Sequence, residues 1–192
     1  MLKAKILMLG PCQSGKTVLS NFLSDSTDSA GGDYQPTQGV RILEFEVPSS
    51  DVKSRTSVEV ELWDVSGDKK FETCWPAIAR DVNGIVFVYN PDQSNHDKEL
   101  EYLFTYFAEQ GALKENQCIV FSHVKPRSTG DIQSELPDEE TASSFSRITT
   151  VQTNLDEDGE AVRDAFNKFL ATLVTALSDK REEEELSIIN QR

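Results

Sequence analysis

Short apolar runs bounded by turn residues alternate along this chain with segments whose apolar residues recur at helical spacing. Strands are expected at residues 4–9, 40–47, 57–63, 84–89, 117–122 and 147–152. Helices are expected at residues 17–23 and 96–109, and a closing helix carries apolar residues on one face from Ala161 to Leu177. This alternation favours an α/β fold with a mostly parallel six-stranded sheet flanked by helices. Ligands of such folds bind at the carboxyl ends of the strands.

Two polar stretches interrupt this pattern. Residues 125–144 include Pro126, Gly130 and Pro137 and predict a long loop. Beyond Asp179, the acidic run at 182–185 predicts a solvated tail that frays from the closing helix. With 192 residues, the chain has room for one full-sized core. We therefore expect one domain over residues 1–178 and an acidic C-terminal tail over residues 179–192.

The charge balance restricts the partners. Lys and Arg number 19 against 33 Asp and Glu, which gives a formal net charge of −14. Such a surface repels polynucleotides and anionic lipids, so we exclude nucleic-acid binding. Three widely spaced cysteines suit free thiols in a reducing compartment such as the cytoplasm. No Gly follows Met1 and the last residues include no Cys, so no lipid anchor is expected.

Residues 10–17, Gly-Pro-Cys-Gln-Ser-Gly-Lys-Thr, match the pattern G-x-x-x-x-G-K-[ST] between a predicted strand and a predicted helix. The backbone N–H groups of such a loop point at phosphate oxygens. The Lys16 ammonium would lie between the β- and γ-phosphates, and the Thr17 hydroxyl would coordinate magnesium. The predicted nucleotide-binding residues of this loop are Gly10, Pro11, Cys12, Gln13, Ser14, Gly15, Lys16 and Thr17.

Two later motifs complete the predicted site. Leu-Trp-Asp-Val-Ser-Gly at 62–67 ends the third predicted strand, which places Asp64 near the phosphate loop. Asp64 can take the second magnesium shell, and the Gly67 N–H can contact a γ-phosphate. Thr37, in Tyr-Gln-Pro-Thr-Gln-Gly at 34–39, can close over the metal. We therefore predict magnesium at Thr17, Thr37 and Asp64, and nucleotide contacts at Thr37, Asp64 and Gly67.

The order of these three motifs resembles the Ras superfamily of small GTPases and its Rab-like branch. Three further segments are similar to the Rab-like subunits of the intraflagellar transport B complex: Lys-Ala-Lys-Ile-Leu at 3–7, Pro-Thr-Gln-Gly-Val-Arg-Ile-Leu-Glu-Phe at 36–45 and Cys-Trp-Pro-Ala at 74–77. The resemblance implies a P-loop NTPase fold of the small-GTPase type that binds GTP or GDP with Mg²⁺. It further implies binding to coiled-coil subunits of that complex, a role in cilium assembly, and a cytoplasmic and ciliary location.

Two positions depart from the family pattern. Asp68 stands where small GTPases carry the Gln that orients the attacking water, and its carboxylate would face the γ-phosphate with like charge. Asp68 is thus the candidate catalytic residue, and we expect slow or absent GTP hydrolysis. Ser122-His123-Val124-Lys125 replaces the guanine-reading Asn-Lys-x-Asp. His123 and Lys125 either flank the base or are solvated loop residues, and selectivity for guanine over adenine stays open.

Three functions fit this pattern to different degrees. The first is a binding module controlled by nucleotide, and the second is a structural adaptor in which nucleotide is constitutive or dispensable. A small-molecule phosphotransferase is disfavoured, because the loop after Lys125 offers only Arg127 to phosphates. Trp75 and Phe71 are expected in core or switch-helix packing, and they are also the best candidates for a partner surface. His96 is expected at the surface, where a helix begins.

Overall fold

The structure, a computed structural model, describes residues 2–26, 35–48, 57–124 and 147–189, with side chains up to residue 179. The strands are β1 (Leu2–Leu9), β2 (Val40–Val47), β3 (Val58–Val65), β4 (Gly84–Tyr89), β5 (Cys118–His123) and β6 (Thr150–Thr153). The α-helices are α1 (Lys16–Leu23), α2 (Trp75–Ile78), α3 (His96–Phe104) and α4 (Leu155–Ile189). Short helical turns are η1 (Lys69–Cys74), η2 (Thr105–Glu109) and η3 (Glu115–Gln117).

The six described strands form one sheet in the order β2-β3-β1-β4-β5-β6. Only the β2–β3 pair is antiparallel, and the other four pairs are parallel. The predicted α/β fold class is confirmed. The central strands β1 and β4 are apolar along most of their length because helices cover both of their faces.

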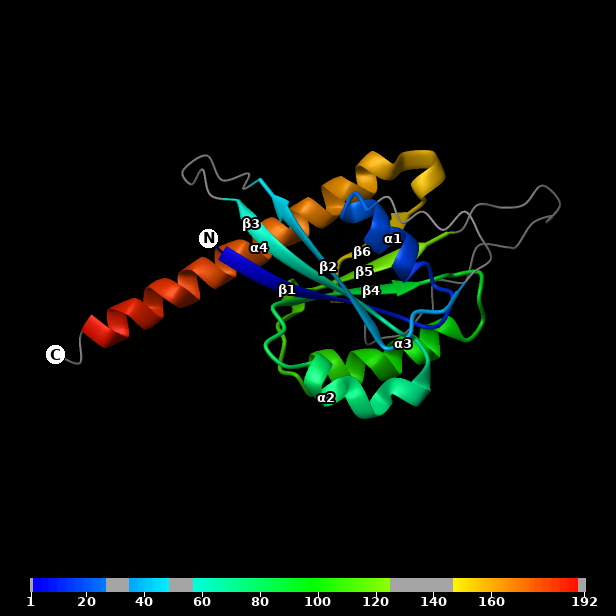
Figure 1. Ribbon diagram of the computed structural model, residues 1–192, viewed down its shortest axis with the longest axis horizontal. Helices are drawn as coiled ribbons and strands as arrows, with labels where there is room; N and C mark the ends of the chain where they lie inside the picture. Colours follow the sequence, from blue (N-terminus) through cyan, green and yellow to red (C-terminus); the bar gives the residue numbers. More distant parts are fainter. Residues whose placement is uncertain (1, 27–34, 49–56, 125–146, 190–192) are drawn as a thin grey trace.

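Side chains that alternate along the strands contribute to two apolar cores, one on each face of the sheet. In β1, Ile6 and Met8 pack with α1 and α4 on one face of the sheet. Leu7 and Leu9 face the other way and pack with α2 and α3. Figure 1 shows this arrangement, with α1 and α4 on one side of the sheet and α2 and α3 on the other.

The parallel register sets which loops meet at the carboxyl edge of the sheet. Met8 of β1 pairs with Asp64 of β3, and Leu9 pairs with Phe87 of β4. The loop that follows β1 therefore starts beside Asp64 and beside the end of β4. This edge is where an α/β fold of this kind places its ligands.

Two expectations about the helices need correction. The closing helix continues to Ile189 instead of fraying near Asp179, because the Lys, Arg, Glu and Leu residues that follow are good helix formers and charge alone does not end a helix. The predicted helix at 96–109 is an α-helix only to Phe104 and ends in a π-helical turn. The turn η1 and the four-residue α2 were too short to predict. The expected loop at 125–144 lies outside the described residues, and the division at residue 178 stays a prediction.

Candidate functional site

The candidate phosphate loop joins the end of β1 to the start of α1 at Lys16. Gln13 and Gly15 adopt positive φ angles of 61° and 103°, which curl the chain back before it enters the helix. A Cβ atom at Gly15 would lie 2.3 Å from Cδ2 of His123. Both conformation and space therefore require glycine there. The helix α1 starts directly after this loop, and the first backbone N–H groups of a helix have no intrahelical acceptor, an arrangement suited to an anion.

Lys16 folds across the loop instead of pointing into solvent. Its ammonium donates to the carbonyl oxygens of Gly10 at 2.8 Å and Pro11 at 2.7 Å, and the residue is only 6% exposed. Ser14 is fully buried in the same loop, and its hydroxyl has no hydrogen-bond partner among the described residues. A positive charge and a free hydroxyl are thus held inside a tight turn, in a protein whose overall charge is strongly negative.

Thr17, Thr37 and Asp64 converge from three separate segments. The Thr17 hydroxyl lies 3.0 Å from the Thr37 hydroxyl and donates to Asp64 Oδ2 at 2.8 Å. The Thr37 hydroxyl lies 3.4 Å from the same carboxylate oxygen. Asp64 is fully buried, and its Oδ1 has no partner among the described residues. An unpartnered carboxylate oxygen beside two hydroxyls fits a hard cation such as Mg²⁺.

Burial sets the protonation behaviour of this cluster. Desolvation raises the pKa of Asp64, and the hydrogen bond from Thr17 and the charges of Lys16 and Arg41 oppose that rise. In the described part of the chain, no group of three or more His, Cys, Asp and Glu side chains is placed to hold a metal. A metal at this edge would therefore depend on hydroxyl and ligand oxygens beside the one carboxylate.

The segment after β3 lies directly against the phosphate loop. A Cβ atom at Gly67 would be 2.5 Å from the backbone nitrogen of Cys12 and 2.5 Å from the carbonyl carbon of Pro11. The Asp68 side chain caps η1. It accepts from the Lys70 N–H at 3.0 Å and pairs with the Lys70 ammonium at 2.9 Å. These contacts, the backbone hydrogen bond first, lower the pKa of Asp68.

His123 joins the phosphate loop to the last two strands. It is 3% exposed, its Nδ1 lies 3.1 Å from the Thr153 hydroxyl, and its ring faces Gly15. The alternative in which His123 is a solvated loop residue is therefore wrong. Lys125 lies outside the described residues. Asn154, next to Thr153, accepts from the Asp156 N–H at 3.1 Å where α4 begins.

The expected surface position of His96 is wrong. His96 is buried, and its Nδ1 accepts the Asn90 N–H at 3.1 Å. Trp75 is 5% exposed and packs against the tilted rings of Tyr106 and Phe107, with ring centroids 4.9 Å and 5.2 Å away. The indole of Trp75 is therefore part of the core. The expectation of core packing is confirmed for Trp75, and its use as a partner surface stays a prediction.

Sequence reasoning missed Arg41. This residue lies on β2 directly opposite Asp64, and its guanidinium is 3.7 Å from Asp64 Oδ2. A signal was present, because Arg41 occupies an inward position of a strand whose next inward residues, Leu43, Phe45 and Val47, are apolar.

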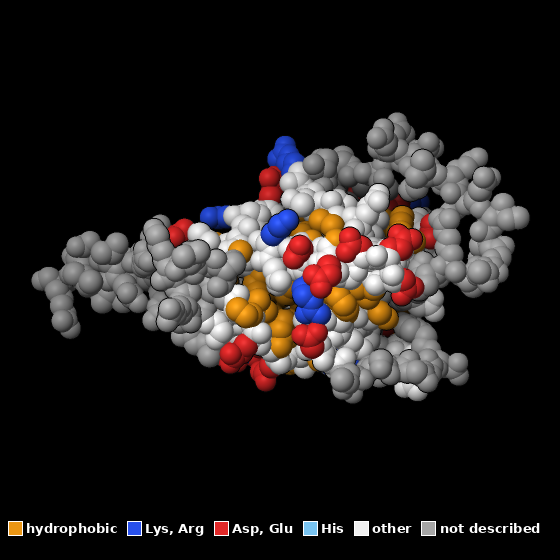
Figure 2. Space-filling model, turned by 90° about the horizontal axis from the view of Figure 1, so that it is seen from above, with side chains coloured by type: hydrophobic (Ala, Val, Ile, Leu, Met, Phe, Trp, Pro, Cys, Tyr) orange, Lys and Arg blue, Asp and Glu red, His pale blue; other side chains and the backbone are white. Residues whose placement is uncertain are grey.

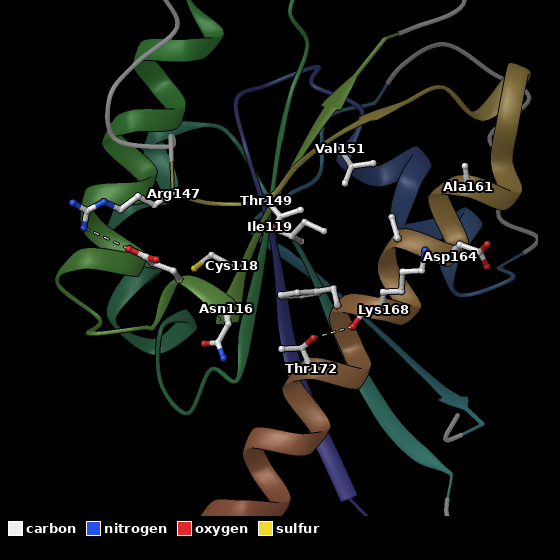
Figure 3. Close-up of a pocket in the computed structure, with 13 residues that line it drawn as sticks. Asn116, Cys118, Ile119, Arg147, Thr149, Val151, Ala161, Asp164, Lys168 and Thr172 are labelled. Atoms are coloured by element: carbon white, nitrogen blue, oxygen red, sulfur yellow. Dashed lines mark hydrogen bonds and ion pairs between the residues drawn. The ribbon is translucent and has the colours of Figure 1, made fainter. Parts of the chain in front are cut away.

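A cavity of about 670 Å³ lies on the α4 side of the sheet, away from the phosphate loop. Figure 3 shows Ile119 of β5, Val151 of β6 and Lys168 of α4 around it. No residue of the phosphate loop lines this cavity. It is separate from the candidate site.

The molecular surface carries mixed charge. Figure 2 shows acidic and basic side chains interspersed with apolar ones on the face that it presents. Cys12 and Cys74 are exposed free thiols, and Cys118 is a buried one whose pKa burial raises to about 12. Among the described helices, none combines the length and the apolar composition that a membrane crossing needs.

Comparison with known proteins agrees with this geometry. Residues 5–125 match the family model described as Roc, the Ras of Complex domain of DAPkinase. The chain is 46% identical over 189 residues to an intraflagellar transport protein 22 homolog of Xenopus tropicalis, covering 98% of this chain and all of the relative. It is also similar to the crystal structure of T. brucei IFT22/74/81 bound to GTP, with a TM-score of 0.74, 29% identity, and coverage of 93% of this chain and 98% of the other. The GDP-bound crystal structure of T. brucei IFT22 gives a TM-score of 0.68 and 28% identity, and covers 90% of this chain and 97% of the other.

Proposed function

This chain belongs to the intraflagellar transport protein 22 family of Ras-like GTPases, and from that premise we propose that it is a nucleotide-dependent binding subunit of the intraflagellar transport B complex. It binds GTP or GDP with magnesium and hydrolyses GTP slowly or not at all. The observation that carries this proposal is the convergence of Lys16, Thr17, Thr37 and Asp64 at one edge of the sheet. The GTP-bound and GDP-bound relatives support the choice of nucleotide.

The chain's own groups supply most of the phosphate binding. Lys16 would exchange its two carbonyl contacts for phosphate oxygens, a short movement of an ammonium that already lies inside the loop. The hydroxyls of Thr17 and Thr37 would face the cation, and the Asp64 carboxylate would accept from its hydration shell. Magnesium, when bound, neutralises phosphate charge, which the strongly acidic protein cannot do over long range.

A change of bound nucleotide would alter the protein surface through two segments near the phosphate loop, the one after β3 and the one before β2. Gly67 packs on the backbone of Cys12, and Ser66 N donates to Gly39 O at 2.8 Å, which ties the segment after β3 to the segment before β2. Thr37 lies two residues before Gly39. A γ-phosphate that contacts Thr37 and Gly67 would therefore favour one arrangement of both segments, and that preference is the basis of a switch.

The relative of known structure indicates the partners. Because T. brucei IFT22 was solved together with IFT74 and IFT81, we propose that this chain binds the corresponding coiled-coil subunits. It would work at the cilium and in the cytoplasm.

A second candidate is a structural adaptor in which nucleotide only stabilises the fold. It is favoured by the engagement of the Asp68 side chain in capping η1 and in an ion pair with Lys70. In such an adaptor, the partner would bind equally in every nucleotide state.

One experiment separates the two candidates. The affinity for a purified IFT74–IFT81 pair is measured with non-hydrolysable GTP, with GDP and without nucleotide. Thr17→Asn removes the hydroxyl that donates to Asp64 at the candidate magnesium site. Thr172→Asn, on the exposed face of α4, is the matched control. A nucleotide-dependent module binds at least tenfold tighter with the triphosphate and loses that preference only in Thr17→Asn. Equal affinity in all three states supports the adaptor and contradicts the switch.

A further inference from the structure

Arg41 places a guanidinium beside the Asp64 carboxylate, which lies next to the Thr17 and Thr37 hydroxyls at the candidate magnesium site. Arg41 of β2 and Asp64 of β3 are directly opposed across the antiparallel pair, so their side chains share one face of the sheet. Arg41 Nη2 lies 3.7 Å from Asp64 Oδ2 and also donates to Asn21 Oδ1 on α1. The side chain is 32% exposed, and its Nε is buried without a partner among the described residues. The guanidinium therefore spans the space between α1 and β3.

Arg41 acts on Asp64 through charge rather than through orientation. The Thr17 hydroxyl already fixes Asp64 Oδ2 at 2.8 Å, whereas the 3.7 Å separation from Arg41 is too long for a hydrogen bond. Asp64 is fully buried, so water screens its carboxylate poorly, and the charge of Arg41 acts on it together with the charge of Lys16. Asp64 thus has a resident positive charge before any metal arrives.

A resident cation has opposite effects on the two components of a magnesium nucleotide. It repels a divalent ion that binds beside Asp64, and it attracts the phosphates that this ion would neutralise. We propose that Arg41 is a built-in counter-cation of Asp64 that weakens magnesium binding and makes nucleotide retention less dependent on magnesium. This inference rests on the proposed nucleotide-binding function.

The test compares the magnesium dependence of nucleotide release in charge variants. Wild type, Arg41→Gln, Arg41→Met and the charge-preserving Arg41→Lys are loaded with a fluorescent GDP. Its release rate is measured from EDTA to millimolar free Mg²⁺. Arg80→Gln is the matched control, because Arg80 is 82% exposed and pairs only with Asp81 among the described residues. Thermal melting of each loaded variant verifies that it is folded.

The expected result is a roughly tenfold lower half-saturating Mg²⁺ concentration in Arg41→Gln and Arg41→Met. The reason is that a largely buried charge acting on a divalent ion shifts its affinity by about one power of ten. EDTA should also accelerate release more strongly in these two variants than in wild type, while Arg41→Lys and Arg80→Gln behave as wild type. An unchanged half-saturating concentration in both neutral variants overturns the inference. A higher half-saturating Mg²⁺ concentration in the neutral variants also overturns the inference, since it would mean that Arg41 only positions Asp64. If wild type binds no nucleotide at all, the proposed function itself fails.

Discussion

Replacing Gly67 with alanine would push a methyl group into the backbone of the phosphate loop. The new Cβ atom would lie 2.5 Å from the Cys12 nitrogen and the Pro11 carbonyl carbon, and 2.7 Å from the Gly10 oxygen. All three are backbone atoms of a loop fixed between β1 and α1, so no side chain can turn away to make room. Gly67 is not among the described glycines with positive φ, which means that the penalty comes from contact and not from conformation.

The magnitude follows from the overlap. The two segments must separate by at least several tenths of an ångström, and overpacking of this kind costs about 1–3 kcal/mol. For a chain of this length, each kcal/mol lowers the melting temperature by about 2–4 °C, so a decrease of about 2–12 °C is expected. Displaced loop N–H groups should also weaken GTP binding by about tenfold or more, which corresponds to about 1.4 kcal/mol.

The assay is calorimetric melting of the nucleotide-free protein together with a GTP titration. Gly159→Ala is the matched control, since its Cβ atom would meet only the Phe22 side chain, at 3.0 Å, and that ring can move. The control should keep wild-type GTP affinity. Unchanged melting and unchanged GTP affinity in Gly67→Ala would refute the close packing of residue 67 on the loop.

Substitutions at three other positions test neighbouring parts of the site. Asp68→Ala removes the cap of η1 and should lower the melting temperature, whereas Asp68→Asn should keep the cap and the wild-type melting temperature. Single-turnover GTP hydrolysis should stay slow in both variants, and a large loss of hydrolysis rate relative to wild type would instead make Asp68 catalytic. Thr153→Val leaves the buried His123 Nδ1 without that hydroxyl, so chemical denaturation should show a loss of about 1 kcal/mol. Burial raises the pKa of Asp64 in the folded, nucleotide-free protein above its ordinary value of 3.8. The protonated Asp64 side chain therefore stabilises the folded state fully below pH 3.8, and this stabilisation is lost as the pH rises through the raised pKa. Melting from pH 4 to 8 should therefore show a decline in wild type that is smaller in Asp64→Asn, and identical profiles would contradict the assignment.

The sheet and the phosphate loop were largely predictable because local and global signals agree there. β2 and β4 have the bounds that their apolar, β-branched runs predict. The phosphate loop at 10–17 could be recognised from the sequence, because phosphate binding needs glycines, a lysine and a hydroxyl residue at fixed spacing. Family membership was likewise accessible from the motifs.

The parts that escaped prediction depend on contacts between distant segments. The core position of Trp75 was expected, but its ring partners Tyr106 and Phe107, some thirty residues later in the chain, were not. His96 is buried because it accepts a backbone N–H at the end of β4, which no helix pattern reveals. The Arg41–Asp64 contact follows only from the register of β2 on β3, and the sequence alone does not fix that register.

The most direct test of the account is isothermal calorimetry of magnesium GTP binding to wild type, Lys16→Ala and Lys98→Ala. Lys16 is the cation buried inside the phosphate loop, and Lys98 is an exposed lysine on α3. Charge-assisted hydrogen bonds to phosphate are worth about 1.5–3 kcal/mol. Wild type and Lys98→Ala should therefore bind alike, and Lys16→Ala should bind roughly 10- to 100-fold more weakly. Wild-type affinity in Lys16→Ala, or no binding by the wild-type protein, would contradict the claim that this loop holds the nucleotide.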